Sequence, residues 1–266
     1  MTTPTPSTSK GTALITGAST GIGAVYADRL ARRGFDLILV ARNQAKLDAL
    51  AQQLRQATGR NVQVLAKDLG NPAALAEVEA VLRSDARITL LLNNAGVGAT
   101  APLLDSDIAS MESMVSLNVT ALMRLAHAAA PGLVARGGTI VNIASIVAVA
   151  PEMLNGVYGG SKAFVLAFTQ SLQHELGNKG VRVQAVLPGA IATDFWPLAG
   201  VAVAHLPTSI VMTAENLVDA ALAGLDQGEV VTIPSLPDLA DWATLEAARL
   251  ALGPNLSHTL PAARYR

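Results

Sequence analysis

Short apolar segments alternate with amphipathic segments along most of the chain. The apolar segments are rich in Val, Ile, Leu and Ala, as in parallel strands covered on both faces, and span residues 12–16, 37–41, 62–66, 88–92, 139–143 and 181–187. The amphipathic segments predict helices that begin after Gly23 and cover residues 43–58, 72–82, 108–129 (ended by Pro131), 156–177 and 238–252. This alternation predicts an α/β fold with a doubly wound parallel sheet, helices on both faces and a ligand crevice beyond the carboxyl ends of the strands.

Composition narrows the class of protein. The chain has 266 residues, 51% of them hydrophobic and 15% charged, enough apolar material for one domain over residues 10–266. The net charge is −1 without runs of like charge, so we expect neither nucleic acid nor a membrane as a partner. Cysteine is absent, which excludes disulfides and thiolate chemistry. Residues 1–9 are rich in Thr, Ser and Pro and predict a disordered lead, and we expect a cytoplasmic protein.

A glycine cluster directly follows the first predicted strand. Gly17, Gly21 and Gly23 have the spacing Gly-x-x-x-Gly-x-Gly and stand where the chain passes from strand to helix. Glycines there allow a tight turn, and the amides at the start of the next helix attract a pyrophosphate. A tight turn without a ligand is the alternative, and the position after the first strand favours the phosphate site.

Two polar residues follow the second and third predicted strands. Arg42 stands where a dinucleotide fold meets the adenosine ribose; an acidic side chain there suits the 2′-hydroxyl of NAD, whereas arginine suits the 2′-phosphate of NADP. We therefore expect NADP rather than NAD, the alternative being that Arg42 only starts the next helix in solvent. Asp68 has a similar place and either approaches adenine or caps the following helix.

Tyr158 and Lys162 lie four residues apart in a predicted helix, so their side chains share one face. A free tyrosine titrates near about 10 and is a poor acid or base at neutral pH. A neighbouring cation favours the phenolate and lowers the tyrosine pKa toward the useful range. The pair therefore indicates a proton-transfer site, with an exposed helical turn as the alternative.

Five motifs in a fixed order resemble the single-domain, NADP-preferring branch of the short-chain dehydrogenase/reductase superfamily. The resemblance covers residues 10–235, and its motifs are Thr16-Gly17-x-x-x-Gly21-Ile22-Gly23, Asn93-Asn94-Ala95-Gly96, Asn118, Ser145 with Tyr158-x-x-x-Lys162, and Pro188-Gly189-x-x-x-Thr193. It implies a seven-stranded parallel sheet between two layers of helices, in which residues 230–233 are the last strand. It also implies a homodimer or homotetramer.

The resemblance implies roles position by position. Tyr158 would be the general acid, Ser145 would bond the substrate oxygen, Lys162 would hold the nicotinamide ribose while lowering the tyrosine pKa, and Asn118 would hold a water that links Lys162 to solvent. Gly17, Gly21 and Gly23 would cradle the pyrophosphate, Asp68 would contact adenine, Asn94 would lie beside a ribose, and Thr193 would hold the carboxamide. The other implied cofactor contacts are Tyr158, Ser19, Thr20, Ile22, Arg42, Leu69, Ala95, Gly96, Pro188, Gly189 and Ile191.

One departure from the family pattern lies beside the catalytic tyrosine, and another lies in the glycine turn. Gly159 and Gly160 stand where such enzymes often have x-Ala, which adds backbone freedom to the helix. Ser19 and Thr20 supply no basic residue inside the glycine turn, where the family often marks its preference for NADP. The choice of cofactor therefore depends on Arg42.

Substrate specificity is expected in a mobile lid near residues 194–213. Its Phe195 and Trp196, with apolar residues from another segment, suggest a largely hydrophobic ketone or aldehyde. The predicted substrate contacts are Ser145, Ile146, Val147, Met153, Tyr158, Phe195 and Trp196. The apolar residues could instead be ordinary packing residues or a subunit contact. His127, His174 and His258 lack metal-ligand spacing, and no metal is expected. Other readings are an NAD-dependent alcohol dehydrogenase acting oxidatively, or a non-catalytic NADP-binding sensor.

Overall fold

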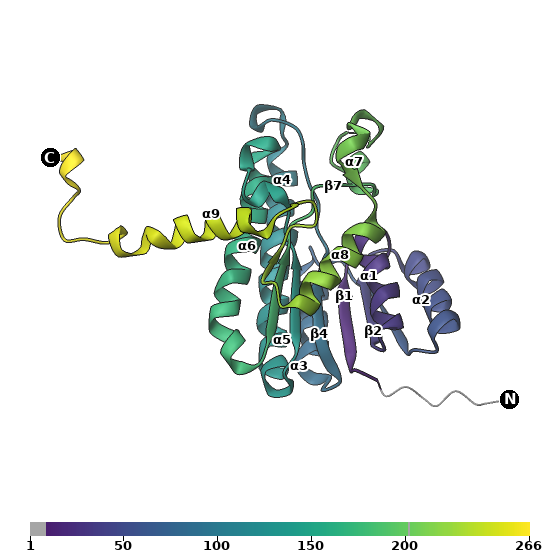
Figure 1. Cartoon of the computed structure of the whole chain (residues 1–266). Coiled ribbons are helices and arrows are strands. Elements are labelled where there is room, and N and C mark those ends of the chain that lie inside the picture. The colour runs from purple at the N-terminus through teal and green to yellow at the C-terminus, as the bar shows by residue number, and fades with distance from the viewer. Residues whose placement is uncertain (1–8, 202) are drawn as a thin grey trace. The chain divides into compact units, whose positions relative to one another are not determined.

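A parallel sheet of seven strands forms the centre of the structure (Figure 1). The structure is a computed structural model, and it describes residues 9–201 and 203–266. The strand order is β3-β2-β1-β4-β5-β6-β9, which confirms the predicted doubly wound seven-stranded sheet. The strands are β1 (Thr12–Thr16), β2 (Asp36–Ala41), β3 (Val62–Ala66), β4 (Ile88–Asn93), β5 (Thr139–Ile143), β6 (Arg182–Val186) and β9 (Val231–Thr232).

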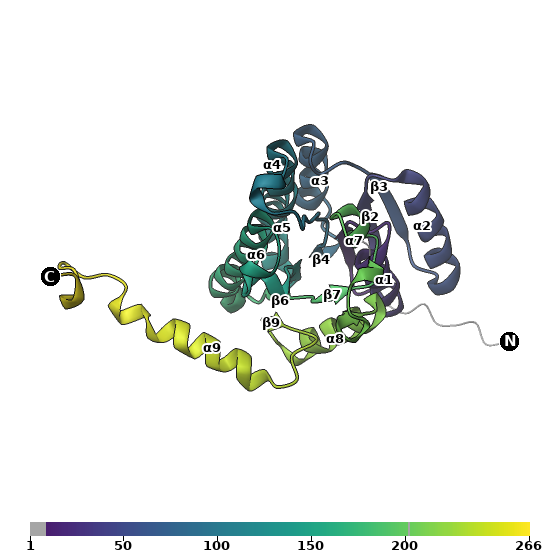
Figure 2. The same cartoon turned by 90° about the horizontal axis from the view of Figure 1, so that it is seen from above.

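Helices cover both faces of this sheet, as the view from above shows (Figure 2). One core cluster joins the sheet to α1 (Gly21–Arg32), α2 (Gln44–Thr58) and α8 (Ala214–Gln227). The second cluster joins its other face to α3 (Pro72–Ser84), α5 (Leu122–Arg136) and α6 (Gly156–Leu176). All five residues of β1 are buried, as expected for a strand covered on both faces. Short 3-10 turns span Leu103–Asp105, Ile146–Ala148, Pro151–Met153, Gly177–Lys179, Val203–His205, Thr208–Ile210, Gly253–Asn255 and Ala263–Tyr265.

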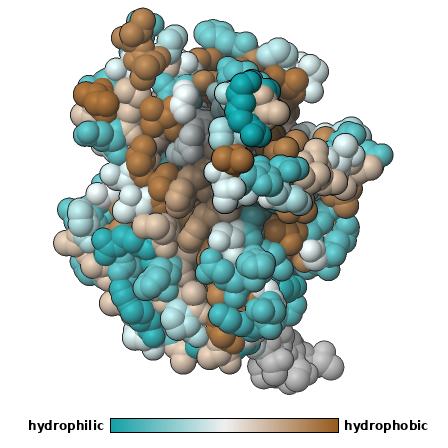
Figure 3. Space-filling view, turned by 90° about the vertical axis from the view of Figure 1, so that its left-hand side faces the viewer, coloured by the Kyte–Doolittle hydropathy of each residue, from teal (hydrophilic) through white to brown (hydrophobic). Residues whose placement is uncertain are grey.

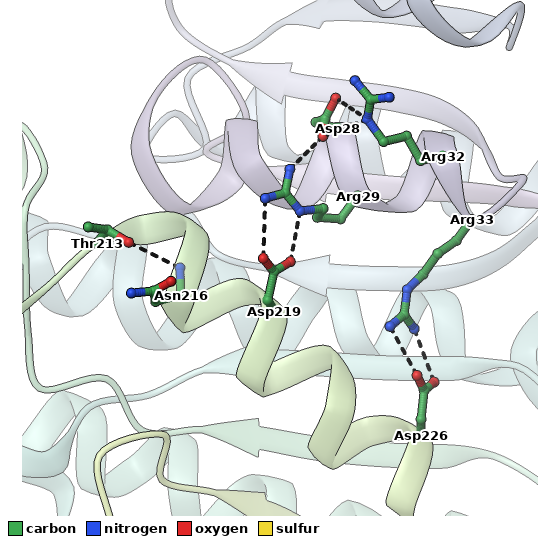
Figure 4. Close-up of polar contacts among 8 residues, drawn as sticks. All are labelled: Asp28, Arg29, Arg32, Arg33, Thr213, Asn216, Asp219 and Asp226. Atoms are coloured by element: carbon green, nitrogen blue, oxygen red, sulfur yellow. Dashed lines mark hydrogen bonds and ion pairs between the residues drawn. The ribbon is translucent and has the colours of Figure 1, made fainter.

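Ion pairs join α1 to α8 across the surface of the first layer (Figure 4). Arg29 donates to both carboxylate oxygens of Asp219, and Arg33 pairs with Asp226 at 3.0 Å. Thr213 caps α8 by accepting a hydrogen bond from Asn216 N at 3.1 Å. The helix that follows the glycine cluster is therefore tied to the helix that follows the predicted lid.

The segment predicted as one helix over residues 108–129 is not one continuous α-helix in the structure and extends further. It comprises α4 (Ile108–Val115), a π-helical turn (Ser116–Ala121) and α5, which continues through Pro131 to Arg136. The prediction that Pro131 ends the helix was wrong. Proline at an exposed position removes one backbone donor, and buried α5 residues on both sides of it, such as Leu125 and Leu133, hold the helix in the core.

A small two-stranded sheet, absent from the predicted elements, lies at the carboxyl end of β6. Strand β7 (Ala190–Ile191) pairs in parallel with β8 (Val211–Met212), so the chain leaves and returns at the same place. Between them lies the four-residue helix α7 (Phe195–Leu198). This pairing defines the base of the predicted lid; residue 202 of the lid lies outside the described residues.

The chain divides into two compact units, Met1–Pro234 and Ser235–Arg266. The second unit contains α9 (Leu239–Ala251), whose residues are all half-buried or exposed. The sequence placed both units in one domain, residues 10–266, and that assignment stays a prediction. The predicted lead, residues 1–9, lies outside the described residues except for Ser9. No helix in the described part of the chain has the length and apolar character needed to cross a membrane.

Candidate active site

The glycine turn between β1 and α1 is held by contacts to the loop after β4. Gly17 has a positive φ of 64°, and a Cβ atom added at Gly23 would overlap the carbonyl oxygen of Gly17. The Asn94 amide donates to Thr16 O at 2.9 Å and Gly17 O at 3.1 Å. The predicted ribose contact Asn94 thus also holds the turn in shape.

The start of α1 fits an anionic ligand. Thr20, its N-cap residue, makes no side-chain capping hydrogen bond in the described chain. The N-cap side chains of six other helices do so, namely α2, α3, α4, α6, α8 and α9. No acidic residue lies in the first turn of α1. The first amides of α1 are therefore without a side-chain partner at the point where a pyrophosphate is expected.

The adenosine end of the predicted site lies after β2 and β3. Arg42 directly follows β2 and is exposed. Asp68 follows β3 and accepts a hydrogen bond from Gly70 N at 2.9 Å, with Leu69 buried beside it. The cap of α3 is Asn71, so the alternative that Asp68 caps this helix was wrong.

Tyr158 and Ser145 meet at the carboxyl end of β5. Tyr158 lies in the first turn of α6 and Ser145 two residues beyond β5, and both side chains are buried. Burial raises the pKa of Tyr158 to about 12, and a hydrogen bond with Ser145 opposes this with a smaller effect. Ser145 Oγ also lies 3.4 Å from Pro188 O, its backbone acceptor in the next motif.

Lys162 lies one turn further along α6 and is buried. Its Nζ donates to Ile143 O at 2.9 Å and lies 5.9 Å from the centroid of the Tyr158 ring. Burial lowers the pKa of Lys162 to about 8. The prediction of a lowered tyrosine pKa was wrong for this arrangement, because desolvation of the phenol is the largest influence on it.

Asn118 lies in the π-helical turn and is bound on both sides. Its Oδ1 accepts from Val97 N at 3.0 Å, and its Nδ2 donates to Val97 O at 2.8 Å and to Ser161 Oγ at 3.1 Å. A Cβ atom added at Gly96 would lie 3.0 Å from Asn118 Oδ1 and 3.6 Å from Lys162 Nζ. Gly96 therefore keeps open a space bordered by Asn118 and Lys162, where a ribose is expected.

The motif Pro188-Gly189-x-x-x-Thr193 lies against the glycine turn. The methyl group of Thr193 faces Gly21, since a Cβ atom added at Gly21 would lie 3.1 Å from Thr193 Cγ2. Ile146 N donates to Pro188 O at 3.0 Å, and Gly189 lies beside the Ile146 side chain. The structure therefore brings the glycine turn and the last motif together, as a shared cofactor site requires.

The predicted substrate residues range from buried to exposed, and Phe195 and Ile146 are half-buried. The Phe195 ring lies 5.7 Å from the Tyr158 ring, centroid to centroid, and Val147 is buried in the same cluster. Met153 is 57% exposed. Trp196 is buried, and its indole Nε1 donates to Ile191 O at 2.9 Å, so it holds the lid to β7. Hydrophobic side chains gather over the upper part of the face in Figure 3.

Sequence reasoning missed Asn155, which fixes the start of α6. Its Oδ1 accepts from Val157 N and Tyr158 N at 2.9 and 3.2 Å, and its Nδ2 donates to Ala101 O at 2.7 Å. Asparagine just before a helix is a known N-cap signal, so the sequence could have revealed the cap. The link to Ala101 depends on tertiary structure.

Comparisons with known proteins agree with this arrangement. The family model described as short chain dehydrogenase matches residues 11–199. A serine 3-dehydrogenase of Agrobacterium fabrum is 37% identical over 187 residues, 70% of this chain and 74% of the relative.

Two solved structures extend the similarity over nearly the whole chain. A short-chain dehydrogenase from Sphingobium yanoikuyae in complex with NADPH has a TM-score of 0.93 and 50% identity, covering 96% of this chain and 100% of that one. The bulky-bulky ketone specific alcohol dehydrogenase from Comamonas testosteroni has a TM-score of 0.89 and 45% identity, covering 97% and 99%. With its glycine turn, its Ser145, Tyr158 and Lys162 cluster and its sheet order, this chain belongs to the short-chain dehydrogenase family of oxidoreductases.

Proposed function

We propose that this protein catalyses the reversible reduction of a largely hydrophobic ketone or aldehyde to an alcohol, with NADPH as cofactor. The observation that carries the proposal is that Tyr158, Ser145 and Lys162 are all buried and lie together at the carboxyl ends of the strands. NADPH, when bound, supplies the hydride. The protein contributes the proton, the orientation of the substrate and the electrostatics.

Tyr158 is suited to act as the acid in reduction. With a pKa raised to about 12 by burial, it keeps its proton at neutral pH. A carbonyl oxygen beside its hydroxyl gains negative charge during reduction, and the Tyr158 and Ser145 hydroxyls stabilise that charge by donating hydrogen bonds. Tyr158 then transfers its proton to this oxygen, and in the oxidative direction it takes the proton back.

Lys162 supports the proton transfer by Tyr158, and Asn118 holds the residues around Lys162. With a pKa of about 8, Lys162 is mostly protonated at neutral pH, and its charge favours the phenolate that remains after transfer. Lys162 Nζ also borders the space above Gly96, where it can hold the nicotinamide ribose. Asn118 holds Val97 and Ser161 in place around this space.

The preference for NADP rests on Arg42 and on similarity. Arg42 is exposed at the carboxyl end of β2, where its guanidinium can pair with a 2′-phosphate. The relative from Sphingobium yanoikuyae was solved with NADPH. A side-by-side comparison of NADPH and NADH, repeated with Arg42→Ala, tests this part, and loss of discrimination in the variant supports it.

The apolar residues near Tyr158 support a hydrophobic substrate. Phe195 and Val147 share a cluster with Tyr158, and the relative from Comamonas testosteroni is specific for bulky-bulky ketones. A panel of ketones and aldehydes, followed by the absorbance of NADPH, tests the proposal directly. Binding of NADPH without oxidation across the panel would instead favour a non-catalytic sensor.

The substitution Tyr158→Phe tests the assignment of the acid. It removes one hydroxyl and should lower kcat by about 10²–10⁴-fold, the range typical of general acid catalysis. NADPH affinity, measured by fluorescence titration, should change little because the ring is kept. Near-normal turnover by a folded Tyr158→Phe variant contradicts the assignment.

A further inference from the structure

The tip of the Phe195 ring packs directly against Gly98. Gly98 lies in the loop after β4 and Phe195 starts α7 in the predicted lid. A Cβ atom added at Gly98 would overlap Phe195 Cζ and would lie 2.6 Å from Cε2 and 3.3 Å from Cε1. The tip of the phenyl ring therefore occupies the space that any side chain at position 98 would take.

Two further contacts fix the lid on either side of this ring. The Trp196 indole donates to Ile191 O at 2.9 Å, which holds the lid to its own base. Thr100 donates to Ala199 O from its hydroxyl at 2.8 Å and from its amide at 3.2 Å, which holds the far end of α7 to the loop of Gly98. Held on both sides, Phe195 cannot retreat far without breaking these bonds.

The Phe195 ring also contacts the ring of Tyr158. The two rings lie 5.7 Å apart, tilted by 44°, and Phe195 packs against the cluster of Met114, Val147 and Tyr158. A carbonyl substrate that reaches the Tyr158 hydroxyl therefore places one of its substituents against Phe195. The depth at which the ring sits over Gly98 sets the room left for that substituent.

We propose that Gly98 is a specificity-determining residue. Its missing side chain forms a recess for the tip of Phe195, and this recess clears space above Tyr158 for a large apolar substituent, in particular an aryl group that packs on the Phe195 ring. The substrate class is then ketones with a bulky aromatic substituent. This inference rests on the proposed function, since it assumes carbonyl reduction at Tyr158.

The test compares a large and a small ketone with NADPH, n-butyl phenyl ketone and acetone. Gly98→Val pushes Phe195 toward Tyr158 and should lower kcat/KM for the aryl ketone about tenfold or more, while acetone changes by less than about twofold. Gly98→Ala should give a smaller change in the same direction. In the double variant with Phe195→Ala the selective loss should disappear, because no ring remains to be displaced.

A matched control and a structural readout accompany these rates. Leu198→Ala truncates an apolar side chain on the same short helix, 77% exposed, and should not change the ratio of the two rates. Trp196 meets Phe195 edge to face at 5.5 Å, and the chain has only two tryptophans. In a Trp242→Phe background, the near-UV circular dichroism of Trp196 should change on Gly98→Val.

Two kinetic outcomes overturn the proposal, and one spectroscopic outcome does so as well. One is an equal loss for both ketones, and the other is a selective loss that persists when Phe195 is alanine. An unchanged Trp196 signal in Gly98→Val likewise contradicts displacement of the ring. Failure of the proposed function is distinct, because the wild-type protein would then bind NADPH and reduce neither ketone.

Discussion

The glycine turn on the proposed nucleotide side and the pair of Tyr158 and Lys162 on the proposed catalytic side affect stability in opposite ways. On the nucleotide side, the backbone carbonyl groups of Thr16 and Gly17 accept hydrogen bonds from the Asn94 side chain. On the proposed catalytic side, Tyr158 and Lys162 are buried. Burial raises the pKa of Tyr158 and lowers the pKa of Lys162, so it favours the neutral form of each side chain. Changes on the first side should therefore destabilise the fold, and selected changes on the second should stabilise it.

This difference fits the role that we propose for each side. A pyrophosphate is recognised by backbone amides whose position must be fixed, so packing and binding favour the same geometry. Proton transfer instead needs titratable groups held away from water, which opposes folding stability. The following changes separate these two effects.

The largest effect is expected from Gly23→Ala on the nucleotide side. The added methyl group would overlap Gly17 O and lie 2.6 Å from Asn94 Nδ2, so the turn must open. We expect a loss of about 3 kcal/mol in unfolding free energy, measured by urea denaturation, and a loss of NADPH affinity of about 100-fold. The control is Gly253→Ala, where an added Cβ meets no atom of the described chain within 4 Å. Normal stability and affinity in Gly23→Ala would refute the close approach.

Lys162→Met on the catalytic side should abolish most activity and yet stabilise the protein at pH 7. Lowering the lysine pKa from 10.5 to about 8 corresponds to about 3 kcal/mol of destabilisation while the group is charged. The lost bond to Ile143 O offsets part of this gain. Urea denaturation at pH 7 measures the difference, and a less stable variant would contradict the prediction.

The same residue sets a pH dependence with a definite sign. Between pH 8 and 10 the unfolded chain still holds the Lys162 proton that the folded chain has lost, so wild-type stability should rise with pH relative to Lys162→Met. Above pH 10, Tyr158 acts in the opposite direction, because its raised pKa keeps a proton that the unfolded chain releases. Parallel stability curves for the two proteins between pH 8 and 10 would show that Lys162 is not desolvated.

Trp196→Phe should have an intermediate effect confined to the lid. It keeps an aromatic ring but removes the hydrogen bond to Ile191 O, worth about 1 kcal/mol. We expect KM for a bulky ketone to rise about fivefold, as that energy loss allows, with NADPH affinity unchanged. Steady-state kinetics and fluorescence titration measure the two, and an equal loss of NADPH affinity would place Trp196 with the cofactor instead.

Gly160→Ala should give the smallest effect, a stabilisation of about 0.5–1 kcal/mol, since alanine favours a helix over glycine. An added Cβ at Gly160 meets no described atom within 4 Å, whereas at Gly159 it would lie 3.2 Å from Pro151. Gly159→Ala is therefore the matched control and should not stabilise. Thermal unfolding of the Gly160→Ala and Gly159→Ala variants measures the two changes in stability. An equal rise in Tm for both would mean that Pro151 moves aside at little cost.

Much of the fold could be predicted because its signals are local. Five residues of β1 and the apolar core of β2 read directly as buried strands, and Gly17 to Gly23 mark the turn that follows. Pro131 was misread because a local rule was outweighed by the packing of α5 against the core. The pairing of β7 with β8 was missed because strands of two residues have no readable pattern.

The sequence could predict which residues gather at the candidate site, but not what surrounds each of them. The structure brings Ser145, Tyr158 and Lys162 together, while their individual environments depend on distant segments. Phe195 and Trp196 are adjacent in sequence, yet one faces Tyr158 and the other bonds to Ile191 O. Adjacent residues on a helix point in different directions, and the segments that fold around the helix decide what each side chain contacts.

The sequence alone therefore determined the order along the chain of the strands of the main sheet and the identities of the polar groups that follow them, since these depend on local periodicity and turn chemistry. Tertiary structure decided the direction of the Tyr158 pKa shift, the hydrogen bond from Asn155 to Ala101 O and the recess at Gly98. Each of these depends on burial or on contacts between residues far apart in the chain, which no local pattern records.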